Sequence, residues 1–187
     1  MRSQWPVRIV DKELVLQPLR FRDKASWEEV RTRNREWLTP WEATRPRVEG
    51  YGELPSFFQM VRYYNRDGRE GRSLTFAIWY ERRFVGLITL GGIVYGALRG
   101  AHIGYWIDQK YANRGLTTRA VIALTDYAFR ELHLHRIEIN LRPENAASAR
   151  VAEKAGYIFE GRRSRYLHID GDWRDHLTYI RENPEVH

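Results

Sequence analysis

The sequence predicts an α+β domain built on a mixed, mostly antiparallel β-sheet, and two observations carry this prediction. Strand-like runs joined by short turns at 73–95 and at 158–180 are typical of antiparallel hairpins. Segment 115–134 instead has the apolar spacing of an amphipathic helix and joins strand 101–107 to strand 135–142. A strand–helix–strand connection of this kind implies one parallel pair within the sheet.

The first third of the chain predicts one strand and two helices. Residues 13–20 alternate as a strand does, and Asp23 can cap a helix that runs through 26–38. Two prolines make 38–53 a loop. Pro55 suits the first turn of a second helix, which ends toward Asp67-Gly68.

The rest of the chain predicts six strands and two helices. Strands are expected at 73–80, 84–95, 101–107, 135–142, 158–169 and 173–180, with Gly91-Gly92 marking a bulge or bend. Gly156 ends the helix at 144–157. The total is about seven strands and about four helices. No break divides residues 1–187, so we expect a single domain.

Composition narrows the class of protein. The hydrophobic fraction of 43% and the aromatic fraction of 13% favour a packed core over a disordered chain. The absence of cysteine excludes disulfides, thiolate metal sites and a cysteine nucleophile. The N-terminal residues lack the apolar stretch of a signal peptide, and no run is long enough for a membrane span. We therefore expect a cytoplasmic protein without membrane contact.

The net charge of +7 indicates attraction to polyanions, such as nucleic acid, the ribosome or a phosphorylated cofactor. The arginines are scattered and form no dense basic tract. The net charge therefore does not indicate which of these polyanions the protein binds.

The segment YANRGLTTRA (111–120) is the most informative one, because it follows a strand and opens a helix. Free N–H groups and the helix dipole make such an N-terminus an anion site, unless it is an ordinary capped helix. The pattern matches neither a Walker loop nor the GxGxxG of dinucleotide sites. The residues that would hold the anion are Asn113, Arg114, Gly115, Leu116, Thr117 and Thr118.

Three stretches together resemble the GNAT superfamily of N-acetyltransferases, and within it the RimJ/RimL branch, RimJ most of all. They are YANRGLTTRA, NAASARVAEKAGY (145–157) and YLHIDGDWRDH (166–176), and LTPWEA (38–43) also fits the branch. The resemblance covers roughly residues 10–182. It implies an enzyme that transfers the acetyl group of acetyl-CoA to a protein N-terminus and uses no metal.

The resemblance also implies where acetyl-CoA binds. Strand 101–107 would splay from strand 136–142, and the pantetheine arm would pair with the backbone of Trp106, Ile107 and Asp108. The pyrophosphate would lie on the amides of 113–118. Asn145 would cap the next helix and face the pantetheine, with Ser148 near the thiol.

Three positions depart from the family pattern. Ala112 and Thr117 replace the first and last residues of the usual pyrophosphate motif, so we expect weaker binding there. Many members carry a tyrosine as general acid where this chain has Ala152. Another group must therefore protonate or stabilise the leaving thiolate.

The catalytic candidates are His102, Asn140, Ser148 and Tyr166. His102 stands where related enzymes often carry a glutamate base, and a neutral imidazole can accept a proton near pH 7, although it could also be a plain strand-end histidine. Asn140 could position a water. Its neighbour on the same strand face, Glu138, is expected to be solvated rather than catalytic. Ser148 or Tyr166 could assist the thiolate, or could simply start a helix and pack in a strand.

Two further groups have structural and functional interpretations. A metal site is conceivable at the polar residues around the last turn, but an Asp-Gly hairpin turn explains them better; they are His168, Asp170, Asp172, Asp175 and His176. Trp37, Trp41 and Tyr63 could grip a peptide over the cleft or could pack helices onto the sheet.

The leading hypothesis is acetylation of the α-amine of a ribosomal protein by direct attack in a ternary complex, with association to the ribosome through the basic surface. One alternative acceptor is a small amine such as an aminoglycoside or polyamine. Another alternative is a weakly active, RNA-associated protein that kept the fold. Neither the acceptor nor the oligomeric state can be predicted from the residues.

Overall fold

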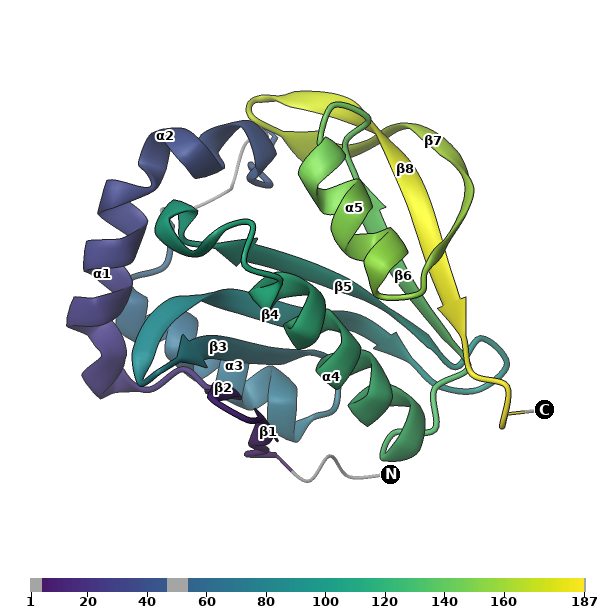
Figure 1. Cartoon of the computed structure of the whole chain (residues 1–187), viewed down its shortest axis with the longest axis horizontal. Helices are drawn as coiled ribbons and strands as arrows, with labels where there is room; N and C mark the ends of the chain where they lie inside the picture. Colours follow the sequence, from purple (N-terminus) through teal and green to yellow (C-terminus); the bar gives the residue numbers. More distant parts are fainter. Residues whose placement is uncertain (1–4, 47–53, 187) are drawn as a thin grey trace.

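Eight strands form one sheet in the part of the chain that the structure, a computed structural model, describes, namely residues 5–46 and 54–186. Their order across the sheet is β1-β2-β3-β4-β5-β6-β8-β7 (Figure 1). The strands are β1 Ile9–Asp11, β2 Leu14–Pro18, β3 Leu74–Tyr80, β4 Arg83–Val94, β5 Gly100–Ile107, β6 Arg136–Leu141, β7 Ile158–Ile169 and β8 Asp172–Glu182.

Five α-helices lie within those same residues. They are α1 Lys24–Arg33, α2 Arg35–Leu38, α3 Phe57–Arg69, α4 Leu116–Arg130 and α5 Ala146–Lys154. Short 3₁₀ turns precede α1, follow α2 and precede α4, at Phe21–Asp23, Thr39–Trp41 and Gln109–Tyr111. No helix in the described ranges is long and apolar enough to cross a membrane.

The predicted α+β class and mixed sheet are confirmed. All neighbouring strands pair antiparallel except β5 and β6, which are parallel. The parallel pairing is short: it begins at Gly100↔Arg136 and ends at His102↔Glu138. Both strands continue beyond that register, so they splay apart in a V that opens toward the N-terminus of α4 (Figure 1). The predicted splay is thus confirmed as well.

The strand count exceeds the expected seven because the chain makes an extra hairpin at its start. Lys12 has a φ of 54° and turns the chain between β1 and β2. The helix expected at 26–38 is instead two helices that meet at Asn34, whose φ of −104° and ψ of 13° are not helical. The side chain of Asn34 bonds to Val30 O and to the Asp108 carboxylate, which holds this break in place.

The predicted helix starts are near the observed ones but differ in mechanism. Asp23 is the N-cap of α1, yet its carboxylate accepts the Arg20 N–H behind it rather than capping forward. Ser56 caps α3 in a capping box with Gln59, so Pro55 precedes the helix instead of lying in its first turn. The loop expected at 38–53 lies partly outside the described residues.

The predicted turns and bulge are confirmed. The pairing of β4 with β5 shifts register after Gly91, and Gly92 has a φ of 58°. Gly156 follows α5 with a φ of 82°. The β7–β8 turn uses Asp170 and Gly171, both with positive φ.

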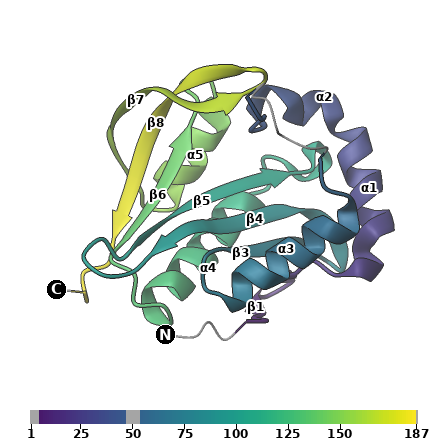
Figure 2. The same ribbon diagram turned by 180° about the vertical axis from the view of Figure 1, so that it is seen from behind.

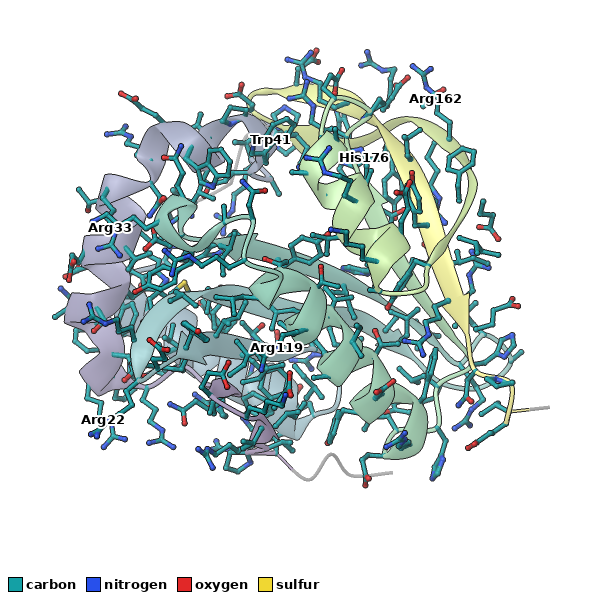
Figure 3. All side chains as sticks on the ribbon, in the orientation of Figure 1. Arg22, Arg33, Trp41, Arg119, Arg162 and His176 are labelled. Atoms are coloured by element: carbon teal, nitrogen blue, oxygen red, sulfur yellow. The ribbon has the colours of Figure 1, made fainter. Side chains whose placement is uncertain are left out.

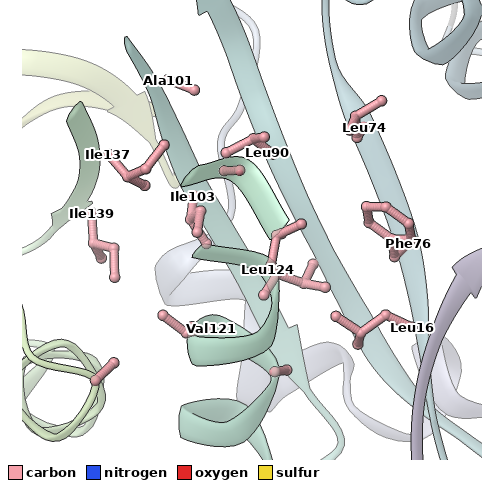
Figure 4. Packing of buried hydrophobic residues seen from close by; sticks show 14 of the residues in the cluster. Leu16, Leu74, Phe76, Leu90, Ala101, Ile103, Val121, Leu124, Ile137 and Ile139 are labelled. Atoms are coloured by element: carbon pink, nitrogen blue, oxygen red, sulfur yellow. The ribbon is translucent and has the colours of Figure 1, made fainter. Parts of the chain in front are cut away.

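Helices cover both faces of the sheet. Helices α4 and α5 lie on one face, and α1 and α3 lie against the other (Figures 1 and 2). The larger apolar cluster fills the α4 side, where Val121 and Leu124 pack on Phe76, Leu90 and Ile103 (Figure 4). A smaller, aromatic cluster fills the α3 side. Side chains on one face of the sheet therefore pack in the larger cluster, and side chains on the other face pack in the smaller one.

Candidate active site

A cavity of about 290 Å³ opens where β5 ends, α4 begins and α5 faces them. Most of the residues predicted to bind the cofactor line it, although the farthest two, Trp106 and Ser148, are 42 positions apart in the chain. The lining residues are Trp37, Leu38, Trp41, Tyr105, Trp106, Ile107, Tyr111, Ala112, Asn113, Gly115, Leu116, Thr117, Thr118, Asn145, Ala147, Ser148, Arg150, Val151 and Lys154.

The splayed edge of β5 presents backbone groups to this cavity. Asp108 N–H donates to Val85 O at 2.7 Å, on the β4 side. Because successive residues of a strand direct their N–H and C=O to opposite edges, Tyr105 and Ile107 direct theirs toward β6, where the strand pairing has ended. Trp37 Nε1 donates to Ile107 O at 3.3 Å, which agrees with this direction.

This register corrects the predicted backbone contacts. Ile107 keeps its predicted place, but the same alternation directs the backbone of Trp106 toward β4. Asp108 does not line the cavity at all, because its N–H and carboxylate are engaged within the protein. Tyr105, which the sequence analysis did not single out, takes their place on the open edge.

The N-terminus of α4 has the form of an anion site. Gly115 is the N-cap with a φ of 73°, and no side chain caps the helix. A Cβ built on Gly115 meets nothing within 4 Å, so the space above it is open. Asn113 also has a positive φ, and the chain therefore curls so that the following amides face the cavity.

Arg114, predicted to add a cation at this site, lies against Tyr111, a residue that lines the cavity. It does not line the cavity, and its guanidinium stacks on the Tyr111 ring at 5.0 Å. Arg119, one turn into α4, binds Asp11 and Glu13 and so ties the helix to the N-terminal hairpin (Figure 3).

Helix α5 supplies cations instead. Arg150 and Lys154 are spaced i, i+4, so they share one face of α5, and both line the cavity. Neither makes an ion pair within residues 5–46 and 54–186. The helical spacing could have paired them in the sequence, because residues four apart share one face of a helix.

Ser148 lies at the inner part of the cavity. As predicted, Asn145 caps α5, and its Oδ1 accepts the Ser148 N–H at 3.0 Å. The Ser148 hydroxyl is 2.7 Å from the hydroxyl of Tyr105. Burial raises the pKa of Tyr105 to about 12, against the lowering effect of its hydrogen bond with Ser148.

The α1–α2 arm closes the cavity over β5. The buried Asp108 carboxylate accepts bonds from Arg33 at 2.5 Å and from Asn34 at 2.9 Å, which fixes the arm to the end of β5. Burial raises the pKa of Asp108, but these bonds outweigh it and hold the pKa below its ordinary value. Figure 3 shows Arg33 on α1 and Trp41 beyond the end of α2. Trp41 is held there by Arg142, whose guanidinium lies 5.6 Å from the ring.

Of the three aromatic residues considered for the cleft, two reach it. Trp37 and Trp41 line the cavity. Tyr63 lies on α3, exposed, beneath the guanidinium of Arg66, and lines neither of the two cavities described here.

A second cavity of about 370 Å³ begins on the opposite face of the sheet, where the V closes. His102 and Glu138 line it, and they are the last paired residues of β5 and β6. The imidazole lies over Gly91 and Gly92, where a Cβ would come within about 3.0 Å of the ring. Burial lowers the pKa of His102, while Glu138 raises it, with a net shift below the ordinary value of 6.5. His102 is therefore neutral and can accept a proton at pH 7.

Glu138 connects the remaining candidates on this face. Arg163 binds its carboxylate at 2.8 Å, and Arg136 at 3.1 Å. Asn140 Nδ2 lies 3.4 Å from the same carboxylate and accepts the Thr178 hydroxyl at 2.8 Å through its Oδ1. The predicted alternation of β6 is confirmed, because Ile137, Ile139 and Leu141 lie in the α4-side core.

Tyr166 lies beside this group and not in the first cavity. Its ring packs on His176 at 5.7 Å, and Arg163 lies 4.8 Å above it. The four catalytic candidates therefore divide between two faces: Ser148 is in the first cavity, and His102, Asn140 and Tyr166 are around Glu138 on the other face.

The polar residues of the last hairpin have local structural partners. His168 Nδ1 bonds Thr44, and Asp175 binds Arg162 and the Arg165 N–H. His176 Nδ1 bonds Arg174 O. Within the described ranges, no three His, Cys, Asp or Glu side chains gather in a way that could hold a metal ion.

The first cavity fits a CoA thioester by three observations. An uncapped helix N-terminus with open space above it suits a pyrophosphate. The open edge at Tyr105 and Ile107 suits the amides of a pantetheine arm. Arg150 and Lys154 add positive charge beside both. An open parallel edge between splayed strands, joined to an anion site, is the arrangement that suits a protein binding a phosphorylated acyl carrier.

Comparison with known proteins gives the family. Residues 13–158 match the Acetyltransferase (GNAT) domain model. The [Ribosomal protein uS5]-alanine N-acetyltransferase of Escherichia coli is 31% identical, over 98% of this chain and 95% of that protein. Probable N-acetyltransferase YjcK of Bacillus subtilis is 32% identical, over 93% of this chain and 96% of its own length. The chain belongs to the GNAT acetyltransferase family.

The solved structures agree. Mycobacterium smegmatis RimJ in complex with CoA-disulfide superposes with a TM-score of 0.89 at 34% identity, covering 100% of this chain and 92% of that one. The ribosomal-protein-S5-alanine acetyltransferase of Vibrio fischeri gives a TM-score of 0.83 at 25% identity, covering 97% and 99%. The Escherichia coli and Vibrio fischeri relatives are thus ribosomal-protein N-acetyltransferases, and this chain is an acyltransferase.

Proposed function

We propose that this protein transfers the acetyl group of acetyl-CoA to the α-amine of a protein N-terminus, and that the acceptor is a ribosomal protein. The single observation that carries the proposal is the first cavity, where a V between parallel strands meets an uncapped helix N-terminus. Relatives at 31% and 34% identity are a ribosomal-protein-alanine acetyltransferase and a CoA-bound RimJ, which supports both parts.

The two cavities lie on opposite faces of the V, so the two substrates would meet at its apex. Bound acetyl-CoA supplies the activated acetyl group as a thioester. Gly115, Leu116, Thr117 and Thr118 would hold its pyrophosphate, with Arg150 and Lys154 adding charge. The N–H groups of Tyr105 and Ile107 face the site and can stabilise the oxyanion that develops on the acetyl carbonyl.

The acceptor side has the groups that deprotonation of an amine needs. His102 is neutral at pH 7 because burial lowers its pKa, and it faces the second cavity at the apex of the V. It would take the proton of the attacking amine, directly or through a water that Asn140 helps to hold. Ser148, on the other face, would donate its hydroxyl to the leaving sulfur.

The charges of the second cavity favour a protein N-terminus over a polyamine. Arg136, Arg163 and His102 line it, and its one acidic residue in the described part of the chain, Glu138, already binds both arginines. Arg136 also binds Glu160, so the charges around this cavity balance and no unpaired carboxylate among its described lining residues would hold a polycation, whereas a peptide presents one amine and neutral backbone amides. Activity on ribosomal proteins implies action in the cytoplasm, which completes the proposal.

Release of free CoA with N-terminal peptides tests this proposal. Peptides that begin with Ala, Ser or Thr are compared with the same peptides blocked at the α-amine and with spermidine. We expect turnover with the free peptides alone. Turnover with spermidine but with no peptide would overturn the assigned acceptor, and absence of a thermal shift with acetyl-CoA would overturn the assigned cofactor.

A further inference from the structure

We propose that Tyr105 is a positioning residue that acts through Ser148: its hydroxyl donates to Ser148 Oγ and so directs the Ser148 O–H into the cavity, toward the leaving sulfur. This inference rests on the proposed function. Many family members carry a tyrosine at the position of Ala152, which is fully buried and has no hydroxyl. In the proposed arrangement, the Ser148 hydroxyl stabilises the leaving thiolate instead.

The contact that carries the inference is the 2.7 Å distance between the Tyr105 and Ser148 hydroxyls. Both residues line the first cavity, and they come from β5 and α5, on either side of it. The Tyr105 ring packs against the α4-side core, so its hydroxyl has little freedom to turn elsewhere. Asn145 fixes the Ser148 backbone at 3.0 Å from its own Oδ1. The pair is therefore held from both elements.

The direction of this bond is part of the proposal, because either hydroxyl could be the donor and Tyr105 Oη also lies 3.4 Å from the Ser148 carbonyl oxygen. Each hydroxyl has one hydrogen, so only one of the two can donate to the other. If Ser148 donated to Tyr105, a serine lone pair would face the sulfur, which becomes negative as it leaves. If Tyr105 donates, the Ser148 hydrogen is free to bond that sulfur. Burial raises the pKa of Tyr105 to about 12, so tyrosine keeps its proton throughout the working range of pH.

The same molecule holds a second pair of hydroxyls that serves as a control. Tyr157 Oη lies 2.6 Å from Thr125 Oγ1. The one hydrogen of Thr125 goes to Val121 O at 2.8 Å, so Tyr157 must be the donor. Both residues are buried, and neither lines either cavity. Tyr157→Phe therefore removes an equivalent bond between residues that line neither cavity.

In the reaction that this serves, the amine nitrogen forms a bond to the acetyl carbon, and the bond from that carbon to sulfur breaks. The proton of the amine goes to the base on the other face of the sheet. The electron pair of the broken bond stays on sulfur, where the Ser148 hydrogen bond stabilises it. Tyr105 transfers no proton; it lowers the energy of the one Ser148 orientation that can donate.

Titration of the thiol of bound CoA tests the inference without turnover. The ultraviolet absorbance of the thiolate is followed against pH in saturated complexes of the wild type, Tyr105→Phe, Ser148→Ala, the double variant and Tyr157→Phe. A hydrogen bond to an anion corresponds to about one to two pKa units. We expect Ser148→Ala to raise the thiol pKa by about that amount, Tyr105→Phe by about half of it, and Tyr157→Phe not at all.

The double variant decides whether Tyr105 acts through Ser148. If it does, Tyr105→Phe adds nothing in the Ser148→Ala background, and kcat falls several-fold in the single variant while the KM for acetyl-CoA stays within about twofold. A Tyr105→Phe shift that persists without Ser148, or one no larger than that of Tyr157→Phe, overturns the inference alone. Failure of the wild type to bind CoA overturns the proposed function instead.

Discussion

Replacement of Gly115 by alanine has two effects that can be measured separately: backbone strain lowers the stability of the protein, and loss of the anion site lowers its affinity for acetyl-CoA. A left-handed residue with a side chain costs about 1–2 kcal/mol, which lowers the melting temperature of a chain of this size by roughly 3–6 °C. A Cβ at Gly115 meets no protein atom within 4 Å, so strain is its only cost in the free protein. In the complex, the same methyl would hold the pyrophosphate away from the amides of α4.

The effect on binding is expected to be larger than the effect on folding. Loss of one hydrogen bond to a charged group costs about 1.5–3 kcal/mol, so Gly115→Ala should raise the Kd of acetyl-CoA by about 10–100-fold. Isothermal titration calorimetry measures this Kd, and thermal melts measure the strain.

Gly171 provides a matched control, because its φ is 80° and a Cβ there also meets nothing within 4 Å. Gly171→Ala lies in the β7–β8 turn, so it should lose the same stability and keep full affinity. Equal affinities of the Gly115→Ala and Gly171→Ala variants would refute the placement of the pyrophosphate at α4.

Three more predictions follow from the site. The double change Arg150→Ala and Lys154→Ala should raise the Kd of acetyl-CoA about tenfold and flatten its dependence on salt; calorimetry at two ionic strengths checks this, and an unchanged salt dependence would contradict it. His102→Gln should lower kcat/KM about 100-fold and abolish the acidic limb of the pH–rate profile, which lies below pH 6.5 in the wild type because burial lowers the pKa of His102. Asp108→Asn should cost about 1.5–3 kcal/mol of stability at pH 7, since Arg33 loses a charged hydrogen-bond partner and keeps its exposed pair with Glu29. The folded-state pKa of Asp108 lies below 3.8, so this contribution is fully present above about pH 4 and is lost progressively as the pH falls through the folded-state pKa; urea unfolding at pH 7 and pH 3 should show a smaller difference in acid.

Local patterns in the sequence determined most of the fold. The parallel pair was predicted because a helix joins two strands, and the bulge and turns because glycines stand where φ must be positive. The break at Asn34 was missed, because that break depends on a carboxylate seventy-four residues away, at Asp108. The helical spacing of apolar residues over 26–38 gives no information about such a distant partner.

The site divides in the same way. Gly115 could be found in the sequence because it belongs to a helix start, where neighbours in the chain are neighbours in space, whereas Asn145 and Ser148 were expected at the site from the resemblance to the GNAT family. Tyr105 could not, because its hydroxyl meets Ser148 only when α5 packs beside β5.

The positions of Arg114 and Asp108 were likewise decided by packing, since stacking on Tyr111 and pairing with Arg33 compete with any ligand. The sequence by itself therefore determined the class of fold and, through its resemblance to the GNAT family, predicted the cradle at α4. Only the tertiary structure decided which groups face the two substrates, because side chains brought together from distant segments compete for the same partners.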